Sequence, residues 1–283
     1  MLDLDATRAP NSPRDAATVI MLRDANGAIE AFCVKRHGKI SFAGGAIVFP
    51  GGKVDPSDHD PAWAALLASD VRRTDELADN ATVARATVVA ACRELLEEAG
   101  YLPLVGDSPS NEHFEALRRD SGKLIEWLTT EHRRLDGASL VPLSRWLTPE
   151  AEARRFDTRF FLHRASATAK PVHEGHENTE SFWASPREAL AQFDRSEIQL
   201  LPPTHRTLTW LAPHANVASA LEAATAHTLA IICPRLIQHV DSQGTTLALA
   251  MPGDPEHAVS ALLSEGPSRF VLRGERWIPE NPG

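Results

Sequence analysis

Apolar and polar positions along the first fifty residues predict a group of short strands. A polar leader at 1–15 is followed by an apolar run at 16–22 (AATVIML), which has the composition of a buried strand. A turn sequence at 23–27 (RDANG) separates this run from an alternating segment at 29–36 (IEAFCVKR). Residues 46–49 (AIVF) form another short apolar run. We therefore expect a hairpin and a third strand.

The most informative pattern lies at residues 90–101 (AACRELLEEAGY), inside a predicted helix over 81–99. Glu94, Glu97 and Glu98 are spaced i, i+3 and i+4, which gathers their carboxylates on one helix face. The apolar residues on the opposite arc are Val88, Cys92, Leu95, Leu96 and Ala99. Gly100 is suited to end the helix. One face is thus predicted to be buried and the other to carry an acidic stripe.

Two interpretations of this stripe are open from the helix alone. Like charges at these spacings repel by a few tenths of a kcal/mol per pair, a cost that an ordinary structural helix has no reason to carry. A hard divalent cation such as Mg²⁺ accounts for the stripe, because it takes carboxylate oxygens as ligands. The alternative is a solvated acidic face without a ligand.

The rest of the chain predicts more helices and strands. An amphipathic helix is expected at 124–135, and a strand at 160–163. The segment 181–193 is expected to end a strand and to begin a helix at its Ser-Pro pair, and further helices are expected within 200–211, after its prolines, and at 218–228. Residues 229–279 consist of short apolar runs separated by turn sequences, which indicates a β-rich extension without a catalytic constellation. The expected fold class is α/β (α+β), with a main domain at 14–212 and the extension at 213–283.

Composition narrows the class of protein. The 283 residues carry a formal charge of −9, which argues against nucleic acid as a partner. The apolar runs are all shorter than a membrane span, so no membrane partner is expected. The three cysteines, Cys33, Cys92 and Cys233, lie far apart in apolar surroundings, and the leader lacks a signal-peptide core. A reduced, cytoplasmic protein is expected, and a homodimer is left open.

The acidic helix gains meaning from the segment FPGGKVD at 49–55. Together the two segments resemble the Nudix box, G-x5-E-x7-R-E-U-x-E-E-x-G-U, where U is an aliphatic or aromatic residue. The second half is matched by Arg93, Glu94, Leu95, Glu97, Glu98, Gly100 and Tyr101, and the first half by Gly51, Gly52, Val54 and Asp55. The resemblance implies a Nudix α/β/α sandwich with a mixed sheet.

The box of this chain is split. Arg93 lies 41 positions after Gly52, whereas the pattern places its Arg fourteen positions after the Gly. We assign the surplus to a helical insertion at about 56–80, which forms either a rim beside the site or a passive surface excursion. Arg85 stands where the first Glu of the box is due. Either Asp58, at the matching distance after Gly52, is the substitute, or this chain lacks that glutamate.

One Nudix branch resembles the chain over most of residues 16–211. Its members split the box and carry an RFDTRFF-like strand followed by a loop and W-x-S-P, matched here at 155–161 and 183–186. That branch includes peroxisomal coenzyme A diphosphatases. The resemblance implies a hydrolase of a pyrophosphate bond in a small-molecule diphosphate, with coenzyme A or acyl-coenzyme A as candidate substrates. The alternatives are ADP-ribose or a dinucleotide, or a catalytically silent module that binds a nucleotide.

The resemblance also implies roles for individual residues. Glu94, Glu97 and Glu98, joined by the carbonyl of Gly51, would hold Mg²⁺ or Mn²⁺, and Arg93 would orient the box by pairing with a carboxylate. A loop glutamate would act as general base, with Glu177 and Glu180 favoured over Glu174. Gly52, Arg36 in the basic cluster 36–39, and Arg159 are the candidate substrate contacts, the arginines through charge-assisted bonds to phosphate. His173 and His176 are weaker candidates as ligands.

Overall fold

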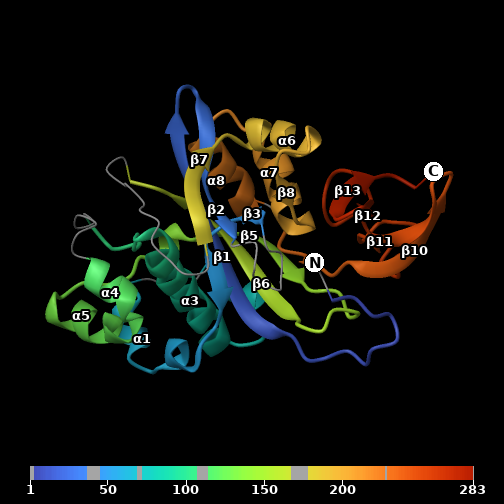
Figure 1. Ribbon diagram of the computed structural model, residues 1–283. Helices are drawn as coiled ribbons and strands as arrows, with labels where there is room; N and C mark the ends of the chain where they lie inside the picture. Colours follow the sequence, from blue (N-terminus) through green and yellow to red (C-terminus); the bar gives the residue numbers. More distant parts are fainter. Residues whose placement is uncertain are drawn as a thin grey trace.

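The main body is built on a mixed β-sheet with helices on both faces (Figure 1). The structure is a computed structural model that describes residues 3–36, 45–68, 72–106, 114–166, 178–226 and 228–282. Within these residues the sheet has nine strands, in the order β8-β3-β2-β1-β6-β5-β9, with β4 paired to β1 and β7 paired to β2. The strands are β1 (Arg14–Ala25), β2 (Ala28–Arg36), β3 (Ala46–Val48), β4 (Gly51–Lys53), β5 (Val141–Leu147), β6 (Phe156–Arg164), β7 (Asn178–Ala184), β8 (Gln199–Leu200) and β9 (Ile231–Ile232).

The central strands β1 and β6 run parallel, with Thr18 opposite Phe160, while β2 and β4 pair antiparallel with β1. The predicted hairpin is present, and its turn is shorter than the expected five residues. It consists of Asn26 and Gly27, both of which have positive φ. Both residue types tolerate this conformation, so the strands extend to Ala25 and from Ala28. The mixed sheet confirms the predicted fold class.

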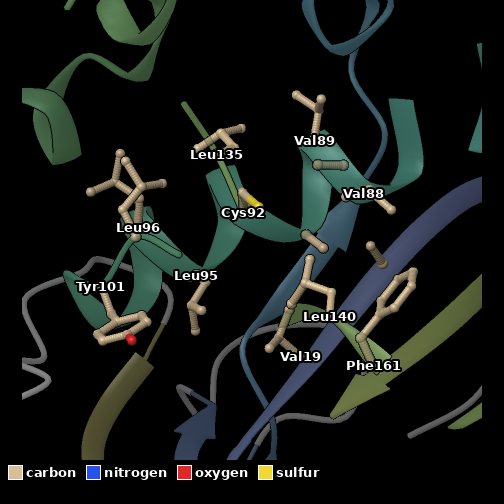
Figure 2. Packing of buried hydrophobic residues seen from close by; sticks show 14 of the residues in the cluster. Val19, Val88, Val89, Cys92, Leu95, Leu96, Tyr101, Leu135, Leu140 and Phe161 are labelled. Atoms are coloured by element: carbon tan, nitrogen blue, oxygen red, sulfur yellow. The ribbon is translucent and has the colours of Figure 1, made fainter. Parts of the chain in front are cut away.

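Helix α3 (Ala81–Ala99) covers one face of the sheet. Figure 2 shows its apolar side, including Val88, Cys92 and Leu95, packed towards Val19 of β1 and Phe161 of β6. Burial of such side chains is worth about 1.5–3 kcal/mol each relative to exposure. The face of α3 that carries the glutamates is thereby turned away from this core.

The opposite face of the sheet is covered by α6 (Pro186–Asp194), α7 (Pro202–Leu211) and α8 (Val217–Ala226). Ser185 accepts a hydrogen bond from the amide of Glu188 and so caps α6 at the predicted Ser-Pro start. Helix α8 packs on β5 and β1, and β9 pairs with β5 at the sheet edge. Residues 217–232 therefore pack on the main sheet.

The predicted β-rich extension is present as a second, four-stranded antiparallel sheet beside the main body (Figure 1). Its strands are β10 (Arg235–Asp241), β11 (Gly244–Ala250), β12 (Arg269–Arg273) and β13 (Arg276–Glu280). Phe270 and Trp277 of this sheet join the same core cluster as the α7 residue Leu208. The extension is thus packed on the body through apolar contacts.

The insertion between the two halves of the box is helical, as predicted, but its helices are short. It contains a 3-10 turn (Pro56–His59), α1 (Trp63–Leu66) and α2 (Thr74–Leu77). Two further short helices, α4 (Glu115–Arg119) and α5 (Leu124–Thr130), follow α3, with 3-10 turns at Ser121–Lys123 and Gly137–Ser139. Among the described residues, no helix is both long enough and apolar enough to cross a membrane.

Candidate metal-binding active site

The box glutamates are carried by a helix whose two ends are fixed by its sequence. Asn80 caps the N-terminus of α3, where its Oδ1 accepts a hydrogen bond from the amide of Val83 at 2.9 Å. Gly100 ends the helix in the left-handed region, with φ of 61°, and its amide donates to the Leu96 carbonyl at 2.9 Å. Glycine adopts this conformation without the strain of a Cβ. Glu94, Glu97 and Glu98 therefore sit at defined positions in the last turns.

The glycine turn meets this helix directly. The Gly51 amide donates to Glu98 Oε2 at 3.0 Å. At Gly52 a Cβ would lie 2.7 Å from Glu94 Oε2 and closer still to Oε1, so the Glu94 carboxylate occupies the space that any larger residue would need. Two segments more than 40 residues apart are thus brought together by their own polar groups.

Arg93 holds the glutamates in place from within the site. Its Nη1 donates to Glu94 Oε1 at 2.8 Å and lies 3.3 Å from Glu97 Oε2. Its Nε and Nη2 donate to the two carboxylate oxygens of Asp58 at 3.0 and 2.9 Å, and Nη2 also donates to the Lys53 carbonyl at 2.9 Å. Such forked, charge-assisted pairs are strong and directional. This is the orienting arrangement expected for Arg93.

Asp58, at the start of the insertion, is the carboxylate that pairs with Arg93. Its side chain is 1% exposed, and its Oδ2 also accepts a hydrogen bond from the amide of Asp55 at 2.8 Å, which fixes the 3-10 turn at the start of the insertion. Asp58, the candidate substitute for the first box glutamate, is thus held against Arg93 on the near side of the insertion.

The three box glutamates concentrate negative charge at the end of α3. Burial raises the pKa of Glu94 to about 7; Arg93 opposes this rise, and the neighbouring charges of Glu97 and Glu98 add to it. A divalent cation would relieve the repulsion among the three carboxylates, and their hard oxygen atoms match the ligands preferred by Mg²⁺ and Mn²⁺. The donor set therefore fits such an ion.

Arg159 does not occupy the predicted position of a phosphate ligand. Its side chain is 2% exposed, and the guanidinium forms an ion pair with Asp15 and donates to the carbonyls of Leu77, at 2.7 Å, and Asp157, at 2.8 Å. Because the strand directs the side chain into the protein, its donors serve the link between β1, β6 and α2. The prediction that Arg159 contacts substrate is therefore corrected. Arg155 is likewise buried and donates to the carbonyl of Asn11 at 2.7 Å.

Of the candidate general bases, Glu180 lies within the described residues. Glu180 lies on β7 opposite Lys35, and its strand neighbours Phe182 and Ala184 pack in the cluster below α6–α8. Because side chains alternate along a strand, Glu180 points to the face opposite α3. Glu174, Glu177, His173 and His176 lie outside the described residues, as does the side chain of Arg36 at the end of β2. Their roles stay predictions.

Two contacts near the box have no signal in the sequence pattern. The hydroxyl of Tyr101 lies 3.2 Å from Nε2 of His163 on β6, and burial lowers the pKa of His163 to about 4. The side chain of Arg118 lies against Gly100, with Cδ 3.3 Å from the position that a Cβ would occupy. A cation at this end of α3 is favourable for the helix dipole. Only the fold brings these residues together.

A second group of metal-ligand residue types lies in the extension. His239, Asp241 and Glu280 are close enough together to share an ion. However, Arg273 forms ion pairs with both Asp241 and Glu280, and its Nε donates to Glu280 at 2.9 Å. The guanidinium already neutralises these carboxylates, so this group is explained by ion pairing within the sheet.

Known proteins were compared with the chain by family, by sequence and by structure. The NUDT19 Nudix domain family matches residues 72–211. Acyl-coenzyme A diphosphatase NUDT19 of Xenopus laevis is 28% identical over 231 residues, covering 66% of this chain and 61% of that protein. The human protein of the same name is 28% identical over 221 residues, covering 62% and 59%. The chain thus spans about three fifths of the length of these relatives.

The fold comparison agrees with the sequence comparison. A crystal structure of a NUDIX hydrolase from Alicyclobacillus acidocaldarius superposes with a TM-score of 0.65, at 28% identity, covering 75% of this chain and 96% of that one. The split box, the α/β/α architecture and these similarities lead to one assignment. Residues 72–211 match the NUDT19 Nudix domain family, and the chain resembles the Nudix hydrolases in both sequence and fold.

Proposed function

We propose that this protein hydrolyses the pyrophosphate bond of a nucleoside diphosphate linked to another group, in a reaction that depends on Mg²⁺ or Mn²⁺. The observation that carries the proposal is the meeting of Glu94 and Glu98 with the Gly51-Gly52 turn, while Glu97 lies on the same side of the helix end against Arg93. All three box carboxylates are retained, and Arg93 and Asp58 hold the arrangement from behind. A silent nucleotide-binding module would have no need to keep this set.

The chemistry divides between the chain and the ion. The cation, when bound, supplies positive charge that offsets the negative phosphate oxygens and polarises water. Glu94, Glu97 and Glu98 are its proposed ligands, together with the Gly51 carbonyl. Glu97, at 31% exposed, is more open than Glu94, at 12%, and faces solvent from which a substrate arrives.

A glutamate acts as the proposed general base, and the turn at Gly52 contributes to substrate binding. Water forms a bond to one phosphorus, the bridging P–O bond breaks, and a glutamate takes the proton of the attacking water. Glu177 is favoured for this task over Glu180, since the strand register directs Glu180 to the other face of the sheet. The turn at Gly52 allows the backbone to approach the phosphates closely.

Coenzyme A or an acyl-coenzyme A is the proposed substrate, which would give 3′,5′-ADP and a phosphopantetheine. The support is the similarity to proteins named acyl-coenzyme A diphosphatase over about two thirds of this chain. A shared fold and box are compatible with other diphosphates, so ADP-ribose and dinucleotides form the alternative class. A cytoplasmic location is also proposed, because the three cysteines lie far apart in apolar surroundings, and a homodimer is the proposed assembly that size-exclusion chromatography would test.

The test is a hydrolysis panel with the purified chain and Mg²⁺, in which products from coenzyme A, an acyl-coenzyme A, ADP-ribose and NADH are separated by chromatography. We expect 3′,5′-ADP from the coenzyme A compounds at a kcat/KM at least tenfold above the other two. A large preference for ADP-ribose would overturn the substrate and keep the reaction. Turnover of none of the four compounds would overturn the proposed activity.

A further inference from the structure

The described part of the chain contains a hollow of about 300 Å³ that no box residue lines. It lies at the seam between α8, the adjoining ends of β5 and β6, and the segment of the insertion just before α2. Its lining residues are Arg72, Ala138, Ser139, Val141, Arg164, Leu221, Glu222 and Thr225. Val141 and Leu221 belong to the core cluster beneath α8 and form an apolar floor.

This hollow is separate from the candidate active site. On β6, Phe160 and Leu162 pack in the cluster below α8, so Arg164, two residues further along, points to that same face, away from α3. Arg164 lies opposite Leu22 of β1, whereas Gly51 lies opposite Thr18. Four residues of strand place the two sites roughly 13 Å apart along β1, in addition to the sheet between them.

Two guanidinium groups from distant parts of the chain converge on the hollow with donors to spare. Arg72 donates through Nε to the Ala138 carbonyl at 2.7 Å, which anchors the side chain. Its two Nη groups have no protein partner among the residues that the structure describes. Among the described residues, Arg164 has one ion pair, with its Nη1 3.7 Å from Asp24 Oδ2, and Asp24 also accepts a hydrogen bond from the amide of Val217 at 2.8 Å. Both arginines can accept an anion as a further partner.

Glu222 is the acidic group on the lining, and it opposes an anion from the α8 side. The hydroxyls of Ser139 and Thr225 are already bonded to the carbonyls of Asp136 and Leu221. The remaining recognition chemistry is therefore two forked cations above an apolar floor. This combination fits a small molecule with an anionic head and a short apolar tail, because the head can pair with the guanidinium groups while the tail covers Val141 and Leu221.

We propose that this hollow is a second binding site, for a small organic anion with a phosphate or carboxylate head and a short alkyl part. Binding there would tie the box insertion, through Arg72, to the sheet, through Arg164, and to α8. The site does not depend on the proposed hydrolysis, because none of its residues belongs to the box.

The test is calorimetric titration of the full chain in EDTA with butyl phosphate, with butyrate, and with butylamine as the cationic control. We expect a dissociation constant in the millimolar range or tighter for at least one of the two anions, and no binding of butylamine. The better of the two anions identifies the head group. Arg72→Gln and Arg164→Gln should each weaken binding at least fivefold, and Glu222→Gln should tighten it about threefold.

Arg119→Gln is the matched control, since Arg119 is an exposed arginine on α4 far from the lining, and it should bind like the wild type. Leu221→Trp fills the hollow and should abolish binding even if an arginine variant folds poorly. Thermal unfolding of each variant checks the fold. Absence of binding by both anions would overturn the proposal. Binding by the Arg72, Arg164 and Leu221 variants as tight as that of the wild type would also overturn it, because the anion would then associate non-specifically with the surface.

Discussion

The pair formed by Asp58 and Arg93 shows how a single interaction supports the site. Both side chains are almost fully buried, and Arg93 serves four acceptors at once, among them Glu94 and the Lys53 carbonyl. A buried guanidinium is stable only when carboxylates compensate its charge, because desolvation of an isolated ion is costly. Asp58 therefore stabilises the fold and also fixes the direction in which Arg93 holds the glutamates.

Replacement of Asp58 by Asn should lower the free energy of unfolding by about 3 kcal/mol, since it leaves part of the Arg93 charge buried without a partner. Chemical denaturation measures this loss. Asp75→Asn, at an exposed position in the first turn of α2, is the control and should change stability by less than about 0.5 kcal/mol. Equal stability of the Asp58 variant and the wild type would contradict the role of this pair.

Gly52→Ala tests the contact between the turn and Glu94. The added Cβ would collide with the Glu94 carboxylate, and a displacement of about 1 Å in such a site costs roughly a hundredfold in rate. We expect kcat to fall by about that factor and Mn²⁺ affinity, measured by calorimetry, to fall with it. Gly122→Ala, on an exposed turn, is the matched control. An unchanged Mn²⁺ affinity in the Gly52 variant would show that Glu94 is not held by this contact.

The buried histidines predict a pH dependence of stability. Burial lowers the pKa values of His163 and His205 to about 4, below the unfolded value of 6.5. Between pH 6.5 and 4 the unfolded chain binds more protons than the folded chain, so stability must fall as the pH falls. At pH 5 each histidine should cost roughly 2 kcal/mol relative to pH 8. Denaturation curves of wild type and His163→Gln should show a shallower pH slope for the variant; equal slopes would contradict the assignment.

At this scale the sequence predicts residue types better than side-chain directions. The spacing of Glu94, Glu97 and Glu98 is enough to place them on one face, because helical geometry is local. Arg93 and Arg159 both look like anion-binding residues, yet the first supports the site and the second is buried in the link to α2. That difference depends on which distant carboxylate or carbonyl lies nearby, which a local pattern does not contain.

At the scale of elements, the insertion between the two halves of the box is packed against the main body and hydrogen-bonded to it. The Leu77 carbonyl accepts a hydrogen bond from Arg159 of β6, and the amide of Leu229 donates to Glu76 at 3.2 Å. The amide of Ala68 donates to the Leu135 carbonyl at 2.9 Å, and the amide of Leu135 donates to the Leu66 carbonyl at 2.8 Å. Trp63 and Leu77 are buried in the core cluster of α3. The insertion is therefore packed against the body along much of its length.

Arg159→Lys tests this bracing role against the original expectation of a substrate contact. Lysine cannot reproduce the forked geometry, so the variant should lose about 2 kcal/mol of unfolding free energy. KM for the best substrate should stay within twofold, because the side chain does not reach the site. A tenfold rise in KM at unchanged stability would restore Arg159 as a phosphate ligand. Denaturation and steady-state kinetics on the same preparation separate the two outcomes.

Helices and strands with strong local patterns are predicted well, and their assembly less so. The helix end at Gly100 and the Ser-Pro helix start at Ser185 follow from local chemistry and are present. Helix α5 ends at Thr130, five residues before the expected end, because His132 adopts a positive φ. The placement of α8 and β9 in the main body depends on long-range packing against β5, for which residues 213–232 carry no local mark.

At the scale of the whole molecule, two arginines link the extension to the main body, one reaching from the body to the extension and the other from the extension to the body. Arg206 of α7 donates to the carbonyls of Glu265 and Pro267, and Arg276 of β13 donates to Ser196 and to the carbonyl of Phe193 at the end of α6. The ring of His205 lies between Phe193 and Phe270, at 5.2 and 5.5 Å. The two sheets are therefore joined by an aromatic core with polar contacts around it.

Arg276→Ala should loosen the extension without unfolding the body. Because the contacts at Phe193 and Ser196 are lost, amide exchange should rise at least tenfold in β12 and β13 and stay within twofold in β1 and β6. Hydrogen–deuterium exchange with mass spectrometry measures both regions at once. Arg187→Ala, an exposed position on α6, serves as control. A uniform rise across both sheets would mean that the extension and body unfold as one unit.

Glu97 and Glu98 are proposed to act with a divalent cation in hydrolysis. The most direct measurement is the rate of coenzyme A hydrolysis as a function of Mg²⁺ concentration for wild type, Glu97→Gln, Glu98→Gln and the exposed control Glu126→Gln. We predict no turnover in EDTA, saturable activation of wild type and Glu126→Gln by Mg²⁺, and a kcat at least a hundredfold lower in the two box variants. Turnover without a divalent cation, or box variants as active as the wild type, would contradict this role of Glu97 and Glu98.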